Sequence, residues 1–125
     1  MAHRVPHVSH AEAVVTRLPL RFDEDDALRW QERFRRYLAE GHKLHVIDVD
    51  AVDLLSATML GFIINVLRMV RDRGGAVGLV ATRDKALHTL GVTGLDRVFS
   101  VGRTVPEALA LITSGAAAPQ SKKAR

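Results

Sequence analysis

The sequence predicts an α/β domain, a mixed β-sheet with about four α-helices packed against it. Short apolar segments with strand character alternate along the chain with longer segments in which apolar residues recur at helical spacing. Short connections join them, and such an alternation is typical of a sheet covered by helices. The chain has 125 residues, 47% of them hydrophobic, which is enough for one domain with its own core. We expect this domain to occupy residues 1–114.

The first half of the chain is expected to form three strands and one helix. The strand-like segments are residues 5–9, 13–18 and 43–49. Acidic residues crowd the start of the helix that follows Pro19, where Asp25 or Asp26 can act as the cap, and Gly41 ends it. The apolar face of this helix is expected to contain Leu28, Phe34 and Leu38, with Trp30 and Tyr37 beside them.

The second half is expected to begin with a long helix from about residue 57 to residue 73, stopped by Gly74 and Gly75. A buried strand, AVGLVA, follows, and then a short helix capped by Thr82. A last strand covers residues 98–101. Thr104 caps the final helix, with Glu107 three residues later as in a capping box. From residue 115 the sequence loses all periodicity, and we expect residues 115–125 to form a disordered basic tail.

The charge and composition argue against several functional classes. The net charge is +4, but three of the positive charges lie in the last four residues and the others are interspersed with acids. With few aromatic residues to stack on bases, nucleic-acid binding is not expected. No apolar run is long enough to span a bilayer, and the absence of cysteine fits the cytoplasm. We expect no metal, no cofactor and no catalytic activity; Asp48 and Asp50 project to one face of a strand, but no nucleophile or catalytic histidine is evident nearby.

The segment DLLSATMLGF, residues 53–62, places two hydroxyl residues at the start of the long helix. Ser56 lies where an N-cap is expected. Thr58 begins a narrow polar stripe, because successive helix residues are about 100° apart; the stripe consists of Thr58, Gly61, Asn65, Arg68 and Asp72. The core face opposite is expected to contain Leu60, Ile63, Ile64, Leu67 and Val70. Thr58 should therefore point to solvent near the positive end of the helix.

Apolar residues border this polar stripe: Met59, Phe62, Val66 and Met69. One interpretation is a contact surface for another protein. The other is that a neighbouring loop or the first helix covers them. The periodicity of this helix alone does not decide between the two.

The order of these motifs resembles that of the STAS domain family. The family pattern is a strand ending in aspartate, then Asp-Ser-Ser-Gly-Leu-Gly opening a long helix, and later Gly-Gly, a strand and Leu-x-x-x-Gly-Leu-x-x-x-Phe. This chain has VIDVDAVDLLSATMLG, DRGGAVGLV and LGVTGLDRVF, and its LRFDEDDA resembles the stretch before the first family helix. Thr58 falls at the second serine, the usual phosphate acceptor. Ser56, Ala57 and Met59 depart from the family's aspartate, first serine and glycine.

The resemblance implies a partner-switching regulator without catalytic activity, similar to an anti-sigma factor antagonist. The unmodified chain would bind a serine/threonine kinase-type anti-sigma factor; phosphorylation of Thr58, with Ser56 as the alternative acceptor, would release it, and a phosphatase would reset the chain. The expected partner-binding residues are Asp23, Ser56, Thr58, Met59, Phe62, Asn65 and Met69. A homodimer is compatible with this hypothesis. The alternative is a scaffold subunit that is not phosphorylated, in an ABC lipid-transporter or stress-signalling complex.

Overall fold

The structure of the protein, a computed structural model, describes residues 13–52 and 54–114. Its centre is a four-stranded sheet in the order β1-β2-β3-β4, all parallel. The strands are β1 (Val14–Arg17), β2 (Leu44–Asp48), β3 (Ala76–Val80) and β4 (Ser100–Gly102). Val15 is paired with Val46, Ile47 with Leu79, and Val80 with Gly102. The strand expected at residues 5–9 and the tail expected at 115–125 lie outside the described residues.

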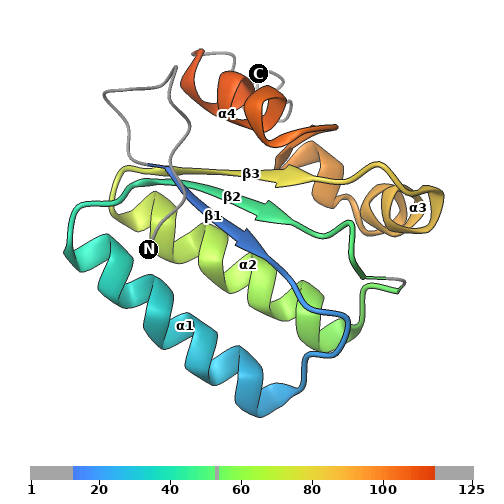
Figure 1. Cartoon of the computed structure of the whole chain (residues 1–125), viewed down its shortest axis with the longest axis horizontal. Helices are drawn as coiled ribbons and strands as arrows, with labels where there is room; N and C mark the ends of the chain where they lie inside the picture. The colour runs from blue at the N-terminus through green and yellow to red at the C-terminus, as the bar shows by residue number, and fades with distance from the viewer. Residues whose placement is uncertain (1–12, 53, 115–125) are drawn as a thin grey trace.

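Helices cover both faces of the sheet, as expected for an α/β fold (Figure 1). They are α1 (Glu24–Ala39), α2 (Ala57–Asp72), α3 (Asp84–Thr93) and α4 (Val105–Thr113), with a short 3-10 turn, η1 (Leu95–Arg97), after α3. α1 and α2 pack side by side on one face, α4 packs on the other, and α3 lies beyond the carboxyl end of β3. The sheet therefore separates two apolar clusters: a large one under α1 and α2, and a small one, with Val46 and Val80, under α4.

Local signals in the sequence account for most of the helix ends. Ser56 caps α2 and Thr104 caps α4, as expected. α1 starts earlier than expected because Asp23, not Asp25 or Asp26, is its N-cap: Asp23 accepts the Asp26 N–H at 2.8 Å, and Asp26 accepts the Asp23 N–H at 3.0 Å. The backbone hydrogen bond from Asp23, helped by Arg29, lowers the pKa of Asp26.

Two further expectations about the helices are wrong. Leu28 is 66% exposed, and the buried stripe of α1 is instead Ala27, Phe34 and Leu38. Ala27, Phe34 and Leu38 recur at the 3.6-residue helical period and so share one face of α1. Leu28 is one residue after Ala27 and is therefore turned away from that buried face. Thr82 does not cap α3; its hydroxyl binds Asp50, and the N-cap residue Arg83 makes no side-chain capping hydrogen bond.

Candidate partner-binding site at the start of α2

The start of α2 lies at the carboxyl end of the sheet. Because all four described strands are parallel, their carboxyl ends meet at one edge, and α1 and α2 both begin there (Figure 1). This arrangement places Asp23, Asp50, Ser56 and Thr58 at the same end of the molecule.

The two hydroxyl residues at this helix start have different environments. The Ser56 Oγ accepts the Met59 N–H at 3.1 Å, and the Ser56 carbonyl accepts the Leu60 N–H at 2.9 Å, so Ser56 has the full geometry of an N-cap. The Thr58 side chain is half-buried and makes no hydrogen bond with any described residue. No acidic residue lies in the first turn of α2. The positive end of this helix dipole is therefore not countered by a carboxylate of the same turn.

The expected polar stripe is present on α2. Gly61, Asn65, Arg68 and Asp72 are exposed, and the stripe continues up the helix from Thr58. Thr58 itself is half-buried, so its hydroxyl is less accessible than the helix geometry alone predicts. The opposite face is core, with Ile63, Leu67 and Val70 buried and Leu60 and Ile64 packed against the same cluster.

The apolar residues beside this stripe do not form an exposed contact surface, so that interpretation is wrong. Met59 is 2% exposed, Phe62 is 1% exposed and Val66 is fully buried. The ring of Phe62 lies 5.0 Å from that of Phe22 and 5.8 Å from that of Phe34, measured between centroids. The second interpretation, cover by the first helix and its preceding loop, is the correct one.

The physical reason is that α2 has two neighbours, the sheet and α1. Its buried arc is therefore wider than that of a helix packed on a sheet alone. Of the expected partner-binding residues, Met59 and Phe62 belong to the core. Asp23, Ser56 and Asn65 are exposed, and Thr58 and Met69 are half-buried.

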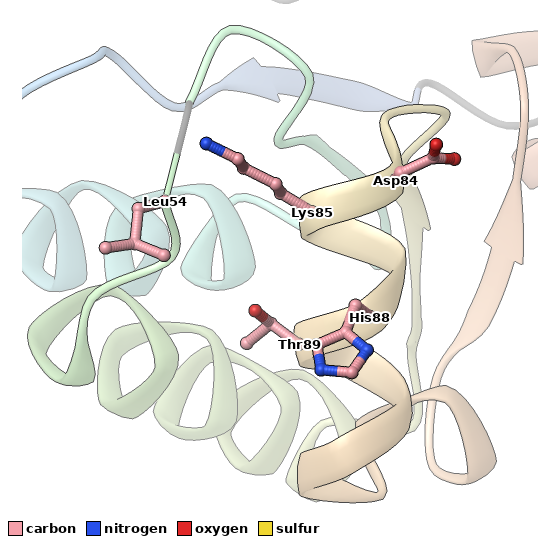
Figure 2. Close-up of a pocket in the computed structure, with 5 residues that line it drawn as sticks. All are labelled: Leu54, Asp84, Lys85, His88 and Thr89. Atoms are coloured by element: carbon pink, nitrogen blue, oxygen red, sulfur yellow. The ribbon is translucent and has the colours of Figure 1, made fainter.

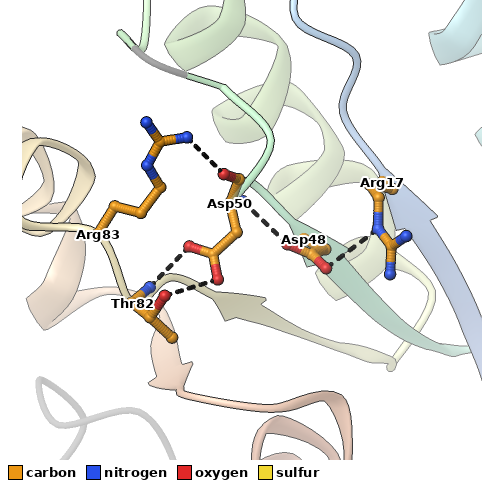
Figure 3. A network of polar contacts seen from close by, with 5 residues as sticks. All are labelled: Arg17, Asp48, Asp50, Thr82 and Arg83. Carbon is orange, nitrogen blue, oxygen red and sulfur yellow. Dashed lines mark hydrogen bonds and ion pairs between the residues drawn. The ribbon is translucent and has the colours of Figure 1, made fainter.

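Asp48 and Asp50 belong to one network of polar contacts at the carboxyl end of β2 (Figure 3). Asp48 is 7% exposed; one carboxylate oxygen accepts the Arg17 Nε at 3.2 Å, and the other accepts the Asp50 N–H at 2.9 Å. Asp50 in turn accepts the N–H of Thr82 at 2.7 Å and its hydroxyl at 2.9 Å. All four carboxylate oxygens accept hydrogen bonds from the protein, so the two aspartates hold β1, the β2–α2 loop and the segment before α3 together.

A groove of about 500 Å³ separates the β2–α2 loop from α3 (Figure 2). Leu54, which is 68% exposed, lines one wall. Lys85 and Thr89 point from α3 toward the segment that carries Leu54, and His88 and Asp84 complete the lining. No sequence pattern predicts this groove, because its two walls are about 30 residues apart and neither has a distinctive motif.

The described residues hold no group of three or more histidine, cysteine, aspartate or glutamate side chains arranged to bind a metal ion. Within the same part of the chain, no helix has the length and apolar character needed to cross a bilayer.

Comparison with known families identifies the fold. The model of the STAS domain family matches residues 4–108. The chain belongs to the STAS domain family. The helices and parallel sheet formed by residues 13–52 and 54–114 are those of this family, and the assignment accounts for the order of the motifs around Asp48, Thr58 and the Gly74–Gly75 pair.

Two STAS relatives come from Thermotoga species. A Thermotoga maritima protein named as a candidate anti-sigma factor antagonist is 33% identical over 79 residues, covering 61% of this chain and 67% of the relative. Its homologue in Thermotoga neapolitana is 30% identical over 76 residues, with the same coverage of both chains. The chain is therefore an anti-sigma factor antagonist-like STAS domain, and such proteins are regulatory rather than catalytic.

Solved STAS structures share the fold. The NMR structure of the Thermotoga maritima protein has a TM-score of 0.73 at 24% identity, covering 80% of this chain and 81% of the other. A crystal structure of the same protein, described as a candidate anti-sigma factor antagonist, has a TM-score of 0.69 at 24% identity, covering 80% of this chain and 86% of the other. An anti-sigma factor antagonist from Mycobacterium paratuberculosis has a TM-score of 0.67 at 23% identity, covering 80% of this chain and 85% of the other. At these identities the likeness concerns the fold.

Proposed function

We propose that this STAS domain is a partner-switching regulator that binds a serine/threonine kinase-type anti-sigma factor and is controlled by phosphorylation of Thr58. The unmodified chain binds the partner in the cytoplasm, the phosphorylated chain releases it, and a phosphatase restores the first state. ATP and magnesium belong to the kinase, and the chain itself contributes a binding surface and an acceptor hydroxyl.

The observation that carries this proposal is the difference between the two hydroxyls at the start of α2. The Ser56 Oγ is occupied by the Met59 N–H, whereas the Thr58 hydroxyl has no hydrogen-bond partner among the described residues. A kinase can engage Thr58 without breaking a capping bond. Thr58 also aligns with the residue that usually accepts the phosphate in the family motif. Ser56, the alternative acceptor, would have to give up its role in the fold.

A phosphate at Thr58 would change the charge of the surface around it. The added group carries about −1.5 to −2 charges at neutral pH. Two carboxylates, Asp23 and Asp50, lie at the same end of the sheet, so the modified surface would become strongly negative. The phosphate can be accommodated because the helix start offers backbone N–H groups and a positive dipole end. A partner that contacts the neutral hydroxyl would then lose its complementary surface.

The altered family motif favours a second candidate function, a scaffold subunit that is not phosphorylated. Ala57 and Met59 replace two residues of the usual acceptor motif, and Met59 is 2% exposed in the core. A chain that has lost part of a kinase recognition motif can retain the fold and a constant binding partner. This candidate predicts that the partner remains bound whatever the state of Thr58.

Identification of the bound partner distinguishes the two candidates. The full chain, carrying an affinity tag, would be expressed in its own cells and its partners identified by mass spectrometry. Thr58→Glu, which adds one negative charge, would be captured in parallel, and Thr113→Glu, on an exposed position of α4, would be the matched charge control. We expect a kinase-type ATPase with the unaltered chain and with Thr113→Glu, and its loss with Thr58→Glu. Capture of an ABC-transporter ATPase by all three would support the scaffold.

A further inference from the structure

Asp50 connects two segments that are distant in sequence, the β2–α2 loop and the start of α3 (Figure 3). Its carboxylate accepts two hydrogen bonds from Thr82, one from the N–H at 2.7 Å and one from the hydroxyl at 2.9 Å. Its backbone carbonyl accepts a third, from the Arg83 Nη1 at 3.0 Å. Asp50 itself is held in place by Asp48, which accepts its N–H at 2.9 Å. All these contacts converge on one residue at the carboxyl end of β2.

α3 depends on this connection because it has no cap of its own. Its N-cap residue, Arg83, makes no side-chain capping hydrogen bond, although a helix start normally requires acceptors for its first N–H groups. The Asp50 carboxylate accepts the N–H of Thr82, the residue just before the cap, and places a negative charge at the positive end of α3. Asp50 accepts no N–H of the first turn of α3; it fixes the backbone just before the helix and adds a negative charge near its start.

The same connection lies beside the groove. Leu54, four residues after Asp50, forms one wall, and Lys85 and Thr89 of α3 form the other (Figure 2). Movement of α3 relative to the loop would change the width of this groove. The loop that contains Asp50 and Leu54 then leads directly to Ser56 and Thr58.

We infer that Asp50 and Thr82 form a clamp that positions α3 relative to the β2–α2 loop, the segment just before Ser56 and Thr58, and so fixes the groove between that loop and α3. Asp50 is a positioning residue, since it acts through α3 and the loop. A consequence that rests on the proposed function is that a partner bound at Thr58 meets α3 at a set distance and orientation. The clamp itself does not depend on whether Thr58 is phosphorylated.

Amide hydrogen exchange measured by NMR on the full chain tests the clamp. Asp50→Ala removes both hydrogen bonds from Thr82 to the carboxylate. We therefore expect amide exchange at least about tenfold faster at residues 87–90 of α3. These amides include the Leu87 N–H, which donates to the Arg83 carbonyl. Thr82→Val removes only the hydroxyl bond and should give a smaller increase in the same amides. Exchange within α1 should stay unchanged, and Thr82→Ser should behave like the unaltered chain.

The matched control is Thr93→Val, since the hydrogen bonds of the Thr93 hydroxyl, to the carbonyls of Thr89 and Leu90, lie within α3. It should not accelerate exchange at residues 54–56, whereas Asp50→Ala should.

Unchanged exchange in α3 for both Asp50→Ala and Thr82→Val would overturn the clamp. An equal acceleration in α1 would also overturn it, because it would indicate a general loss of stability. If Asp50→Ala does not fold, Thr82→Val decides alone, because its hydroxyl is exposed. The site of phosphorylation, tested separately, decides the proposed function.

Discussion

Ser56 and Thr58 are two positions apart at the start of α2, and only the Ser56 side chain makes a capping hydrogen bond there. Its Oγ accepts the Met59 N–H at 3.1 Å. Replacing a capping serine by alanine typically costs about 1 kcal/mol. We therefore expect Ser56→Ala to lower the free energy of unfolding by about that amount and Thr58→Ala to leave it nearly unchanged. Denaturant unfolding followed by circular dichroism measures both, and equal losses in the two variants would contradict this assignment.

His45 is a fully buried titratable residue in β2. Its Nε2 lies 2.8 Å from the His42 carbonyl, which can only accept, so the neutral ring donates from Nε2. Nδ1 has no hydrogen-bond partner among the described residues, and the ring of Phe34 lies 5.1 Å away, between centroids. Burial therefore lowers the pKa of His45 from 6.5 to about 4, against a smaller opposite effect of the bond to His42.

This depressed pKa predicts a pH dependence of stability. Below pH 6.5 the unfolded chain protonates His45 while the folded chain does not, so stability is lost as the pH falls from 6.5 toward 4. The free energy of unfolding should decrease by roughly 3 kcal/mol over this window, because one pKa unit corresponds to about 1.4 kcal/mol. Unfolding of His45→Leu should lack this component, and the exposed His88→Gln should retain it. Identical pH profiles for the unaltered chain and His45→Leu would contradict the prediction.

At the scale of the elements, α2 shows what helical periodicity can and cannot predict. Three features of α2 were predicted correctly from residues close together in the sequence. They are the cap at Ser56, the helix end near Gly74 and the polar stripe that contains Asn65. The position of Phe62 was not predicted correctly, because periodicity shows which face is polar but not how many neighbours pack on the other faces. α1 and the loop before it cover that flank through contacts between residues about 30–40 positions apart, such as Phe22 and Phe62.

The packing of α2 against α1 is tested by a charge at its centre. Phe62→Glu should lower the free energy of unfolding by several kcal/mol, because it buries an unpaired carboxylate among Phe22, Trp30 and Phe34. Asn65→Glu, three residues later on the exposed stripe, is the matched control and should change stability little. Thermal unfolding of both variants gives the comparison. A Phe62→Glu chain as stable as Asn65→Glu would place Phe62 on the surface after all.

At the scale of the whole molecule, the alternation of strands and helices was sufficient to predict the fold class. The order of the motifs around Thr58 and Gly74–Gly75 was sufficient to indicate the family. The connection between Asp50 and Thr82 could not be predicted in the same way. It joins residues 32 positions apart. In the sequence alone, Asp50 is typical of a residue at the end of a strand, and Thr82 is typical of a helix cap. The groove beside it was missed for the same reason.

At the start of α2 the Ser56 hydroxyl caps the helix, whereas the Thr58 hydroxyl makes no hydrogen bond with a described residue. The central claim is that Thr58 is the residue through which partner binding is switched. The most direct test is site mapping by mass spectrometry, after the full chain has been incubated with ATP, magnesium and the kinase-type partner it captures. We predict one phosphate, on Thr58, retained in Ser56→Ala and absent from Thr58→Ala. Phosphate on Ser56, or a Thr58→Ala chain that is phosphorylated and released like the unaltered one, would contradict the claim.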